Sequence, residues 1–459
     1  ISEPVTINGA GEGGIGAIYT SGGNADTAST LTLGADATIG GTARMDHSGE
    51  TTDGGNGYTL TKTGSFDFLP SGAANYSHLV INQGSVTLTG DSGLPGAPGR
   101  VTVNSGTTLT TWSHRTIANS PNITLNDGSV FNTARSVDDT MSINGTFTLN
   151  GNTTFRNSRM TSTIDSIIGG TGNLAIEDGG PTTGMFIFTG ANTYTGDTTI
   201  DGVPLQISGT GVLGSGNYAG AIVMNNALTY SSSADQTLSG NITGGANTLT
   251  KDTSAASTLT LTGTSILEDL AVSAGTVDIA GGTLTVTGVT VAASSTLELT
   301  GGTLDLTPVA LSSNSLQING GGVVEISGGT HDLYGRIYNY GTFRVVGNAA
   351  TIAIQQISDQ SGAFEFVLDS DGVSGMSSGS WIQFGNATVD VDGTAYTGGD
   401  QSFHLFEAND LNILCPEGNV NITGFDSKYL VRVDQDQGID KVTLVINDLT
   451  PEPSLFKFK

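Results

Sequence analysis

Acidic residues at short, regular spacing are the strongest chemical feature of the sequence. Residues 434–440 read Asp-Gln-Asp-Gln-Gly-Ile-Asp, and alternating acids around a glycine are typical of a loop that wraps a Ca²⁺ ion. We therefore predict Asp434, Asp436 and Asp440 as a candidate calcium site, and we expect no other cofactor. Val445 stands where an EF-hand loop carries its bidentate Glu, so an acidic hairpin turn is the alternative.

Two further patterns could carry catalysis. Residues 90–93 read Gly-Asp-Ser-Gly, the local signature of chymotrypsin-like serine proteases, but the His segment that would supply the base does not precede them. Outward acids are expected one coil apart in two pairs, Asp278 with Glu298 and Asp305 with Glu325. Glycan-cleaving β-helices use such clusters, yet basic and aromatic partners for a sugar are missing nearby. We predict solvated strand faces and no enzyme.

Metal and disulfide chemistry find little support. The five histidines are scattered and are expected on the surface or in loops: His47, His78, His114, His331 and His404. They lack the spacing of a zinc site, and Cys415 is the only cysteine, so an intrachain disulfide is excluded.

The composition narrows the fold class. Of 459 residues 68 are Gly, charged residues are 12%, and 42 acids against 15 basic residues give a net charge of −27. Such a chain cannot assemble the basic face of a nucleic-acid binder. The glycine content disfavours helices, glycine does not recur every third residue as in collagen, and 36% hydrophobic residues in ordered alternation argue against disorder. An acidic, all-β protein remains.

Residues 275–346 contain an internal repeat of 19 or 20 residues, with three short alternating strands in each period. This predicts a parallel β-solenoid with about 20 residues per three-strand coil. The Gly-Gly pairs at 281–282, 301–302 and 321–322 are expected at one corner. We predict that eight residues face inward: Val277, Ile279, Leu284, Val286, Leu297, Leu299, Leu304 and Leu306.

A longer repeat lies upstream. Residues 57–62, Gly-Tyr-Thr-Leu-Thr-Lys, recur as Asn-Thr-Leu-Thr-Lys at 247–251 and more loosely at 172–176. Residues 188–200, Phe-Thr-Gly-Ala-Asn-Thr-Tyr-Thr-Gly-Asp-Thr-Thr-Ile, and the Gly-Thr-Gly-Val-Leu-Gly-Ser-Gly at 209–216 resemble the autotransporter-associated β-strand repeat. The resemblance is most specific at 168–216 and weaker at 55–103 and 240–290. It implies a right-handed β-helix of a bacterial surface or secreted protein, and it carries no catalytic residues.

Four regions are expected: an N-terminal strand or cap at 1–15, the solenoid at 16–350, a C-terminal β cap or small sandwich at 351–448, and a Pro-containing tail at 449–459. In the tail, Pro-Glu-Pro-Ser at 451–454 resembles the sorting signal of exported bacterial envelope or matrix proteins. The chain begins with Ile, and no apolar run reaches the ~18 residues of a membrane helix. We expect an extracellular or cell-surface protein with its signal peptide removed.

The leading hypothesis is a non-enzymatic structural protein that assembles head-to-tail with itself into a filament, by coil-end stacking or by exchange of a terminal strand. The alternatives are a surface adhesin or matrix protein that binds polysaccharide and, behind it, a β-helix polysaccharide lyase or hydrolase. No nucleic-acid partner and no transmembrane segment are expected. The candidate assembly residues are Ile1, Val5, Ile7, Leu455, Phe456 and Phe458.

Overall fold

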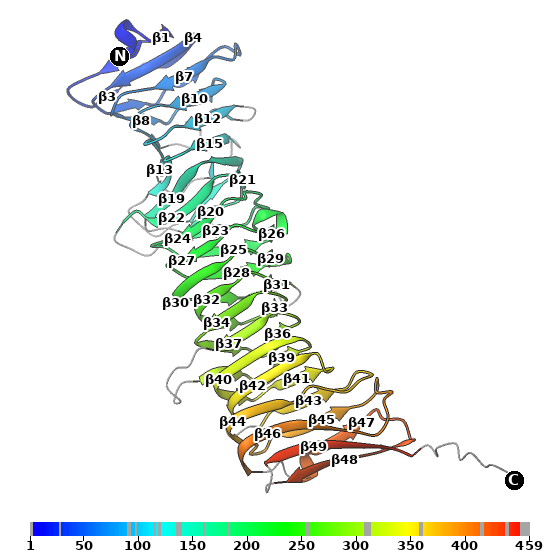
Figure 1. The fold of residues 1–459 in the computed structure, drawn as a ribbon. Coiled ribbons are helices and arrows are strands. Elements are labelled where there is room, and N and C mark those ends of the chain that lie inside the picture. Colours follow the sequence, from blue (N-terminus) through cyan, green and yellow to red (C-terminus); the bar gives the residue numbers. More distant parts are fainter. Residues whose placement is uncertain are drawn as a thin grey trace, which may run out of the picture. The chain divides into compact units, whose positions relative to one another are not determined.

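The computed structural model describes residues 3–26, 29–89, 93–96, 99–112, 116–117, 121–134, 140–158, 161–180, 184–252, 257–306, 314–357, 361–413, 417–436 and 440–449. The chain forms a parallel β-solenoid of about 16 turns, which confirms the predicted fold class (Figure 1). The described residues form no α-helix, so none of them makes a helix able to span a membrane. Three 3₁₀ turns occur, Glu12–Gly14 (η1), Gly214–Gly216 (η2) and Glu417–Asn419 (η3).

The chain divides into two compact units, Ile1–Thr243 and Gly244–Lys459. One sheet of the first unit contains β1 (Val5–Gly9), β2 (Ile18–Thr20), β4 (Thr30–Gly41), β6 (Glu50–Thr52), β7 (Thr59–Lys62), β9 (Ala74–Asn75), β10 (His78–Ile81), β12 (Arg100–Val103), β15 (Asn122–Asn126), β18 (Thr146–Asn150) and β21 (Ile167–Gly170). Its other large sheet contains β3 (Ala25–Asp26), β5 (Met45–His47), β8 (Asp67–Pro70), β11 (Ser85–Leu88), β13 (Thr108–Trp112), β14 (Thr116–Ile117), β16 (Val130–Ala134), β17 (Thr140–Ile143), β19 (Asn152–Ser158), β20 (Thr161–Ile164), β22 (Asn173–Asp178), β23 (Met185–Phe188), β24 (Thr198–Ile200), β25 (Leu205–Gly209), β27 (Ile222–Met224) and β28 (Leu228–Ser232). The short strands β26 (Asn217–Tyr218) and β29 (Gln236–Leu238) pair with each other, and β30 (Ile242–Lys251) passes into the second unit.

The second unit also has two large sheets. The first contains β31 (Thr258–Leu261), β33 (Gly275–Ile279), β36 (Ser295–Leu299), β39 (Val323–Ile326), β41 (Thr342–Val346), β43 (Ala363–Val367), β45 (Thr388–Asp392) and β47 (Val420–Thr423). The second contains β32 (Ser265–Val272), β34 (Thr283–Val286), β35 (Gly288–Val291), β37 (Thr303–Leu306), β38 (Asn314–Ile318), β40 (Gly329–Asn339), β42 (Ala350–Ile357), β44 (Met376–Gln383) and β46 (Gln401–Ile413), with the hairpin of β48 (Tyr429–Asp436) and β49 (Lys441–Asp448) at its end.

The strict alternation of inward and outward residues along each strand decides which side chains form the core. All eight residues predicted to face inward are at most 1% exposed, because successive residues of a strand point to opposite faces. Parallel pairing in register then stacks the buried residues into continuous columns, as in Val277–Leu297–Val324–Phe343. Full burial of each such side chain contributes about 1.5–3 kcal/mol, so the columns supply most of the cohesion between coils.

The repeat of 19 or 20 residues holds from Val277 to Leu297 and again from Val324 to Phe343, but it fails for the coil between them. Leu297 is followed in its column by Val324, 27 residues later, whereas the repeat predicted Leu316 at that place. The expected pair of Asp305 and Glu325 is therefore not formed. Asp305 pairs with Asp332, whereas Glu325 pairs with Glu298.

The glycine corner changes for the same reason. Gly329 comes next to Gly302 at the corner that continues from Gly282, so the pair at 321–322 does not belong to it. Both Gly282 (φ 62°) and Gly329 (φ 87°) have a left-handed backbone, which favours glycine because it lacks a Cβ atom.

The solenoid also continues past residue 350, where the sequence suggested a separate domain. Parallel pairing runs without a break from β41 through β43 and β45 to β47. Among the described strands, antiparallel pairing occurs where β49 pairs with β46 and with β48. Aromatic residues fill these longer coils. Phe364, Phe384 and Phe406 are fully buried and stack edge to face, with ring centroids 4.8–6.0 Å apart.

The motif at 188–200 forms a buried polar corner. The Asn192 Oδ1 atom accepts a hydrogen bond from the backbone N–H of Ile168 at 3.0 Å. The hydroxyls of Tyr194 and Thr198 are 2.8 Å apart, and Thr198 also contacts the hydroxyl of Tyr218 at 2.7 Å. Asn192, Tyr194, Thr198 and Tyr218 are all buried, and these hydrogen bonds hold the turn between coils.

The repeated lysine lies inside the solenoid. Lys62 and Lys251, which end the two copies of the upstream motif, are both fully buried. The Nζ atom of Lys62 donates to the carbonyl oxygens of Gly64 (2.7 Å), Gln83 (2.6 Å) and Phe66, and lies 3.9 Å from the Phe66 ring centroid. Burial lowers the pKa of Lys62 to about 8, although Asp67 acts in the opposite direction. The three donors of the ammonium group thus cap three corner carbonyls.

We expect Lys62→Met to reduce the free energy of unfolding by about 2–4 kcal/mol, because buried carbonyls lose their donor. Chemical denaturation followed by circular dichroism measures the change. Lys441→Met is the matched control, because the half-exposed Lys441–Glu407 ion pair (3.1 Å) contributes less than about 1 kcal/mol. Equal losses in the two variants would contradict the capping role of Lys62.

Two histidines are buried, contrary to the prediction that all would lie on the surface or in loops. His47 is 1% exposed and His331 is 0% exposed. The His331 Nε2–H group donates to the carbonyl of Gly328 at 2.7 Å, and its Nδ1 atom accepts from the backbone N–H of Leu304 at 3.2 Å. Burial lowers the pKa of His331 below its ordinary value of 6.5, so the folded state holds a neutral ring that joins two coils.

The lowered pKa of His331 predicts a loss of stability in acid. Below about pH 6.5 the unfolded chain binds a proton that the folded chain resists, so the free energy of unfolding falls as the pH drops. His47 and His78 also have lowered pKa values and act in the same direction. We expect His331→Gln to show a smaller drop in urea midpoint between pH 7.5 and 5.5 than the parent chain and the His404→Gln control. An unchanged drop would show that His331 does not carry this dependence.

Candidate functional site

The buried column of the second unit ends without full cover at β47. Val389 and Val391 of β45 are at most 1% exposed, and they pair in register with Val420 and Ile422 of β47. Val420 and Ile422 point to the same interior side but are only half-buried, because among the described strands β45 is their only partner in the sheet. The edge of a parallel sheet and the end of its hydrophobic column therefore coincide here.

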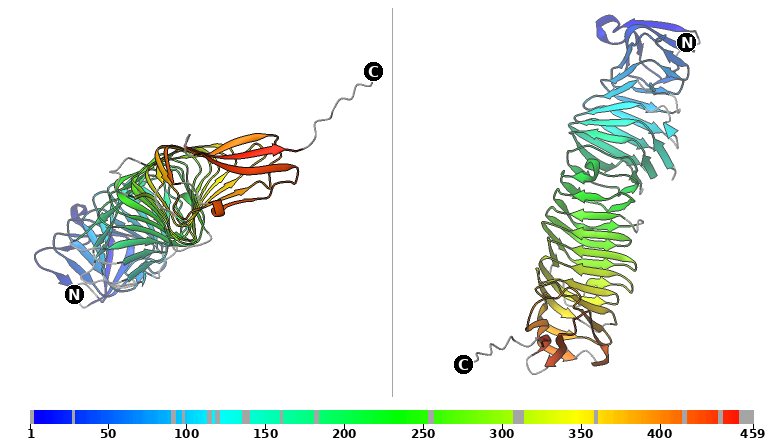
Figure 2. Two further views of the ribbon diagram at one scale, coloured as in Figure 1. Left: turned by 90° about the horizontal axis from the view of Figure 1, so that it is seen from below. Right: turned by 90° about the vertical axis from the view of Figure 1, so that its right-hand side faces the viewer.

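The hairpin β48–β49 covers only part of this end. β49 pairs antiparallel with β46, and β48 pairs with β49. Val431 and Val433 lie directly opposite Ile446 and Leu444 and so share their face. Ile446 and Leu444 are fully buried, but Val431 and Val433 remain half-buried. Figure 2 shows the hairpin (red) at the C-terminal end of the second unit.

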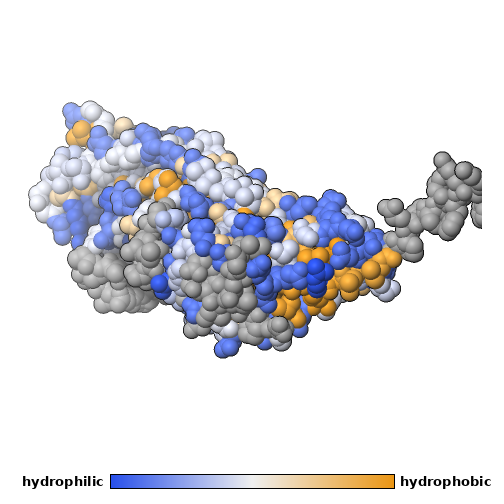
Figure 3. All heavy atoms as spheres, turned by 60° about the horizontal axis from the view of Figure 1, so that its bottom comes forward, coloured by the Kyte–Doolittle hydropathy of each residue, from blue (hydrophilic) through white to orange (hydrophobic). Residues whose placement is uncertain are grey.

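We define the C-terminal end face as the half-buried apolar residues of the last coil and the hairpin: Val420, Ile422, Phe425, Val431 and Val433. Apolar surface (orange) gathers at this end of the second unit in Figure 3. Contiguous apolar surface beside an open sheet edge is the usual mark of a protein–protein contact.

The N-terminal strand is folded onto its own chain. β1 pairs in parallel with β4, which places Val5 beside Leu31 and Ile7 beside Leu33. Ile7 is buried whereas Val5 is half-buried. These two predicted assembly residues are therefore held within the first coil. The other predicted assembly residues, Ile1, Leu455, Phe456 and Phe458, lie outside the described residues.

The N-terminal end of the first unit repeats the features of the C-terminal end face. Ile18 of β2 pairs with the buried Ile39 but is itself only half-buried. Ile15 and Tyr19 are exposed beside it. Among the described strands, β1 and β2 have only β4 as a partner. This end also combines an open strand edge with incompletely covered apolar side chains.

The predicted calcium residues lie at the tip of the hairpin β48–β49. Asp434 and Asp436 point to the same exposed face of β48, and Asp434 is paired with Arg432 at 2.9 Å. Asp440 has a left-handed backbone (φ 53°) at the other side of the turn. No three acidic or histidine side chains of the described ranges form a group that could hold a metal ion, so the calcium site stays a prediction. The Gly-Asp-Ser-Gly segment falls mainly on residues outside those ranges.

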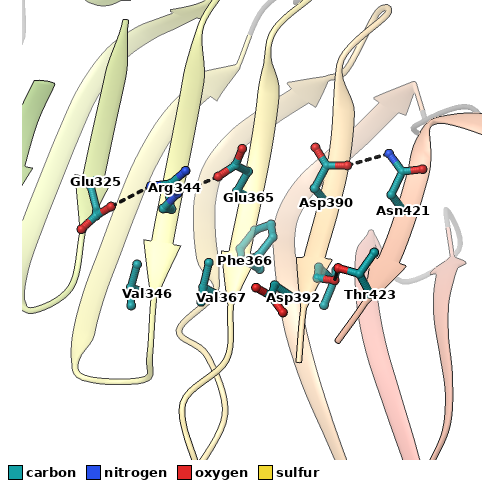
Figure 4. Close-up of a pocket in the computed structure, with 11 residues that line it drawn as sticks. Glu325, Arg344, Val346, Glu365, Phe366, Val367, Asp390, Asp392, Asn421 and Thr423 are labelled. Atoms are coloured by element: carbon teal, nitrogen blue, oxygen red, sulfur yellow. Dashed lines mark hydrogen bonds and ion pairs between the residues drawn. The ribbon is translucent and has the colours of Figure 1, made fainter. Parts of the chain in front are cut away.

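A groove of about 510 Å³ lies on the outer face of β39, β41, β43, β45 and β47 (Figure 4). Arg344 projects between Glu325 and Glu365, with nitrogen–oxygen distances of 3.0 and 2.6 Å. Asn421 donates to Asp390 at 2.6 Å at the far end of the same row. Arg344 follows Glu325 in register, but its second partner, Glu365, lies beyond the regular repeat, so the sequence pattern did not predict this arrangement.

The row of acids extends along the strands that precede the groove. Asp278, Glu298 and Glu325 are successive residues in register, so the predicted pairing of Asp278 with Glu298 is confirmed. Burial and the charges of Asp278 and Glu325 raise the pKa of Glu298. Arg344 is the cation that interrupts this accumulation of negative charge within the row.

Comparison with known proteins leaves the chain without an assigned family. No protein-family model and no curated protein matches it.

We expect Arg344→Gln to lower the thermal midpoint, because Glu325 and Glu365 would then repel each other and their neighbours. The loss should be larger in 20 mM than in 500 mM NaCl, since salt screens charges that are partly exposed. Arg432→Gln, at the exposed pair with Asp434, is the control and should change the midpoint little. A loss in Arg344→Gln that does not depend on salt would contradict an electrostatic role.

Proposed function

We propose that this protein is a non-enzymatic, exported structural protein that assembles head-to-tail with copies of itself into an extracellular or cell-surface filament. The observation that carries the proposal is the incomplete burial of the C-terminal end face, where the hydrophobic column and the sheet edge both end. Export and bacterial origin rest on the sequence resemblance described above.

A second copy suits the end face because the two ends of the chain present matching surfaces. Each end has open edges of parallel strands, β47 at one end and β1 with β2 at the other. Each also has half-buried apolar side chains, Val420 and Ile422 against Val5 and Ile18. A contact between two different surfaces does not close on itself, so repeated contacts produce a fibre.

The structure favours stacking of coil ends over exchange of the N-terminal strand. Val5 and Ile7 already belong to the first coil through β4. Removing β1 for exchange would expose the buried Leu31 and Leu33. Stacking instead adds strands to open edges and keeps each chain's own pairs intact.

The net charge of −27 sets the conditions for assembly. Both ends carry acidic residues, including Glu3 and Glu12 at one end and Asp426 and Asp434 at the other. Repulsion between chains falls as salt screens these charges. Assembly should therefore be stronger in 500 mM than in 50 mM NaCl.

We expect the double variant Val431→Thr/Val433→Thr to weaken assembly about tenfold or more, because it replaces apolar with polar surface at nearly constant shape. Light scattering coupled to size-exclusion chromatography gives the concentration at which mass grows, and negative-stain electron microscopy shows the particles. Val445→Thr is the control, because Val445 lies opposite Arg432 on the other face of the hairpin.

Two results would contradict the proposal. One is a parent chain that remains at monomer mass at every concentration and salt level. The other is equal weakening by the end-face variant and by the Val445→Thr control. Deleting residues 450–459 separates two forms of the contact: filaments lost on deletion would assign the joint to the tail, whereas filaments that persist or grow stronger would assign it to the end face.

A further inference from the structure

The first unit carries a tryptophan that its own core does not use. Trp112 ends β13 and is 48% exposed. Its in-register neighbour on β16 is Ala134, whose small side chain leaves much of the indole uncovered. A tryptophan presents a broad apolar face together with one N–H donor. Such a side chain on the outside of a solenoid is available to a ligand.

Trp112 lines a groove of about 570 Å³ on the outer face of the sheet. The groove crosses β8, β11, β13 and β16, which are neighbours in that order, and Arg44, just before β5, lines its end. Four strands at the usual spacing cover roughly 15 Å. This length suits a short stretch of an extended polymer better than a single small molecule.

Polar groups with fixed positions accompany the indole. Thr87, Thr110 and Asn132 form one row in register across β11, β13 and β16. Asp67 accepts hydrogen bonds from Ser85 at 2.8 Å and from Thr87 at 3.0 Å, which orients these hydroxyls. Thr87 and Thr110 are 8% exposed, and with Asn132 they form the polar floor of the groove.

The charge of the groove selects against polyanions. Arg44 is held by Asp46 at 2.7 Å, and Asp67 adds a further negative charge. The chain as a whole has a net charge of −27, which repels acidic polymers at moderate ionic strength. A ligand that fits needs a flat apolar face for Trp112 and uncharged polar groups, such as hydroxyls, for the polar floor of the groove. Pyranose rings have this combination of an apolar face and a hydroxyl rim.

We propose that the Trp112 groove is a binding site for a neutral polysaccharide. The site lies within the first unit, so it does not depend on the assembly proposed above. In a fibre of stacked copies it would recur once per chain, and weak single contacts would then add through multivalency.

Affinity electrophoresis and intrinsic fluorescence test the site. The probes are soluble neutral glucans and a galactomannan, with polygalacturonate as the anionic comparison. The Trp381→Phe background leaves Trp112 as the only tryptophan, because the chain contains two. We expect a neutral glycan to retard the protein and to shift the Trp112 emission. Trp112→Ala should weaken binding about tenfold or more, since aromatic anchors dominate such contacts.

The matched control is Tyr340→Ala, because Tyr340 is similarly exposed (46%) but lies in the second unit. It should leave binding unchanged. The thermal midpoint of Trp112→Ala should stay near that of the parent chain, which separates a ligand contact from a folding defect. The proposal is overturned if the parent chain binds none of the neutral glycans, if it binds polygalacturonate alone, or if Trp112→Ala and Tyr340→Ala bind equally well. Filament formation is scored separately by light scattering, so either proposal can fail alone.

Discussion

In this protein the inward apolar side chains of each coil are covered by those of the neighbouring coils. The inward columns, such as Val277–Leu297–Val324–Phe343, run along the stack and are joined by parallel strand pairs in register. A globular core closes on itself, but a stacked column has two ends. At β47 the column ends with Val420 and Ile422 half-buried, and the hairpin β48–β49 covers only part of the gap. The proposed assembly follows from this single constraint.

The same constraint explains which residues could be polar. Interior polar groups are tolerated where they join neighbouring coils, as Lys62 does through three carbonyls and His331 does between Gly328 and Leu304. Outward-facing side chains are not needed to join the coils, so they can be charged or can contact a ligand. The row containing Glu325, Arg344 and Glu365 and the groove at Trp112 both use this freedom on otherwise similar strands.

Alternation and period were enough to predict the solenoid and its inward residues in the regular stretch. They failed where one coil lengthens, because a periodic pattern cannot locate the added residues between Leu306 and Leu316. The prediction that His331 would lie on the surface or in a loop was wrong, because burial of a histidine depends on hydrogen-bond partners from another coil. The end face was also beyond prediction: Val389 and Val420 look alike in sequence, and only their places in the stack distinguish them. The row of Thr87, Thr110 and Asn132 in the groove at Trp112 depends on register across several coils, which is why the groove was not predicted.

Hydrogen exchange as a function of protein concentration tests the central claim most directly, because it reports on the backbone of the exposed edge itself. The account predicts that amides of β47 and β48 exchange more slowly as the concentration rises, and that amides of β1 and β2 slow in parallel. Amides of internal strands such as β36 should stay unchanged. Exchange at β47 and β48 that is the same at all concentrations, in salt that screens the negative charge, would contradict the account.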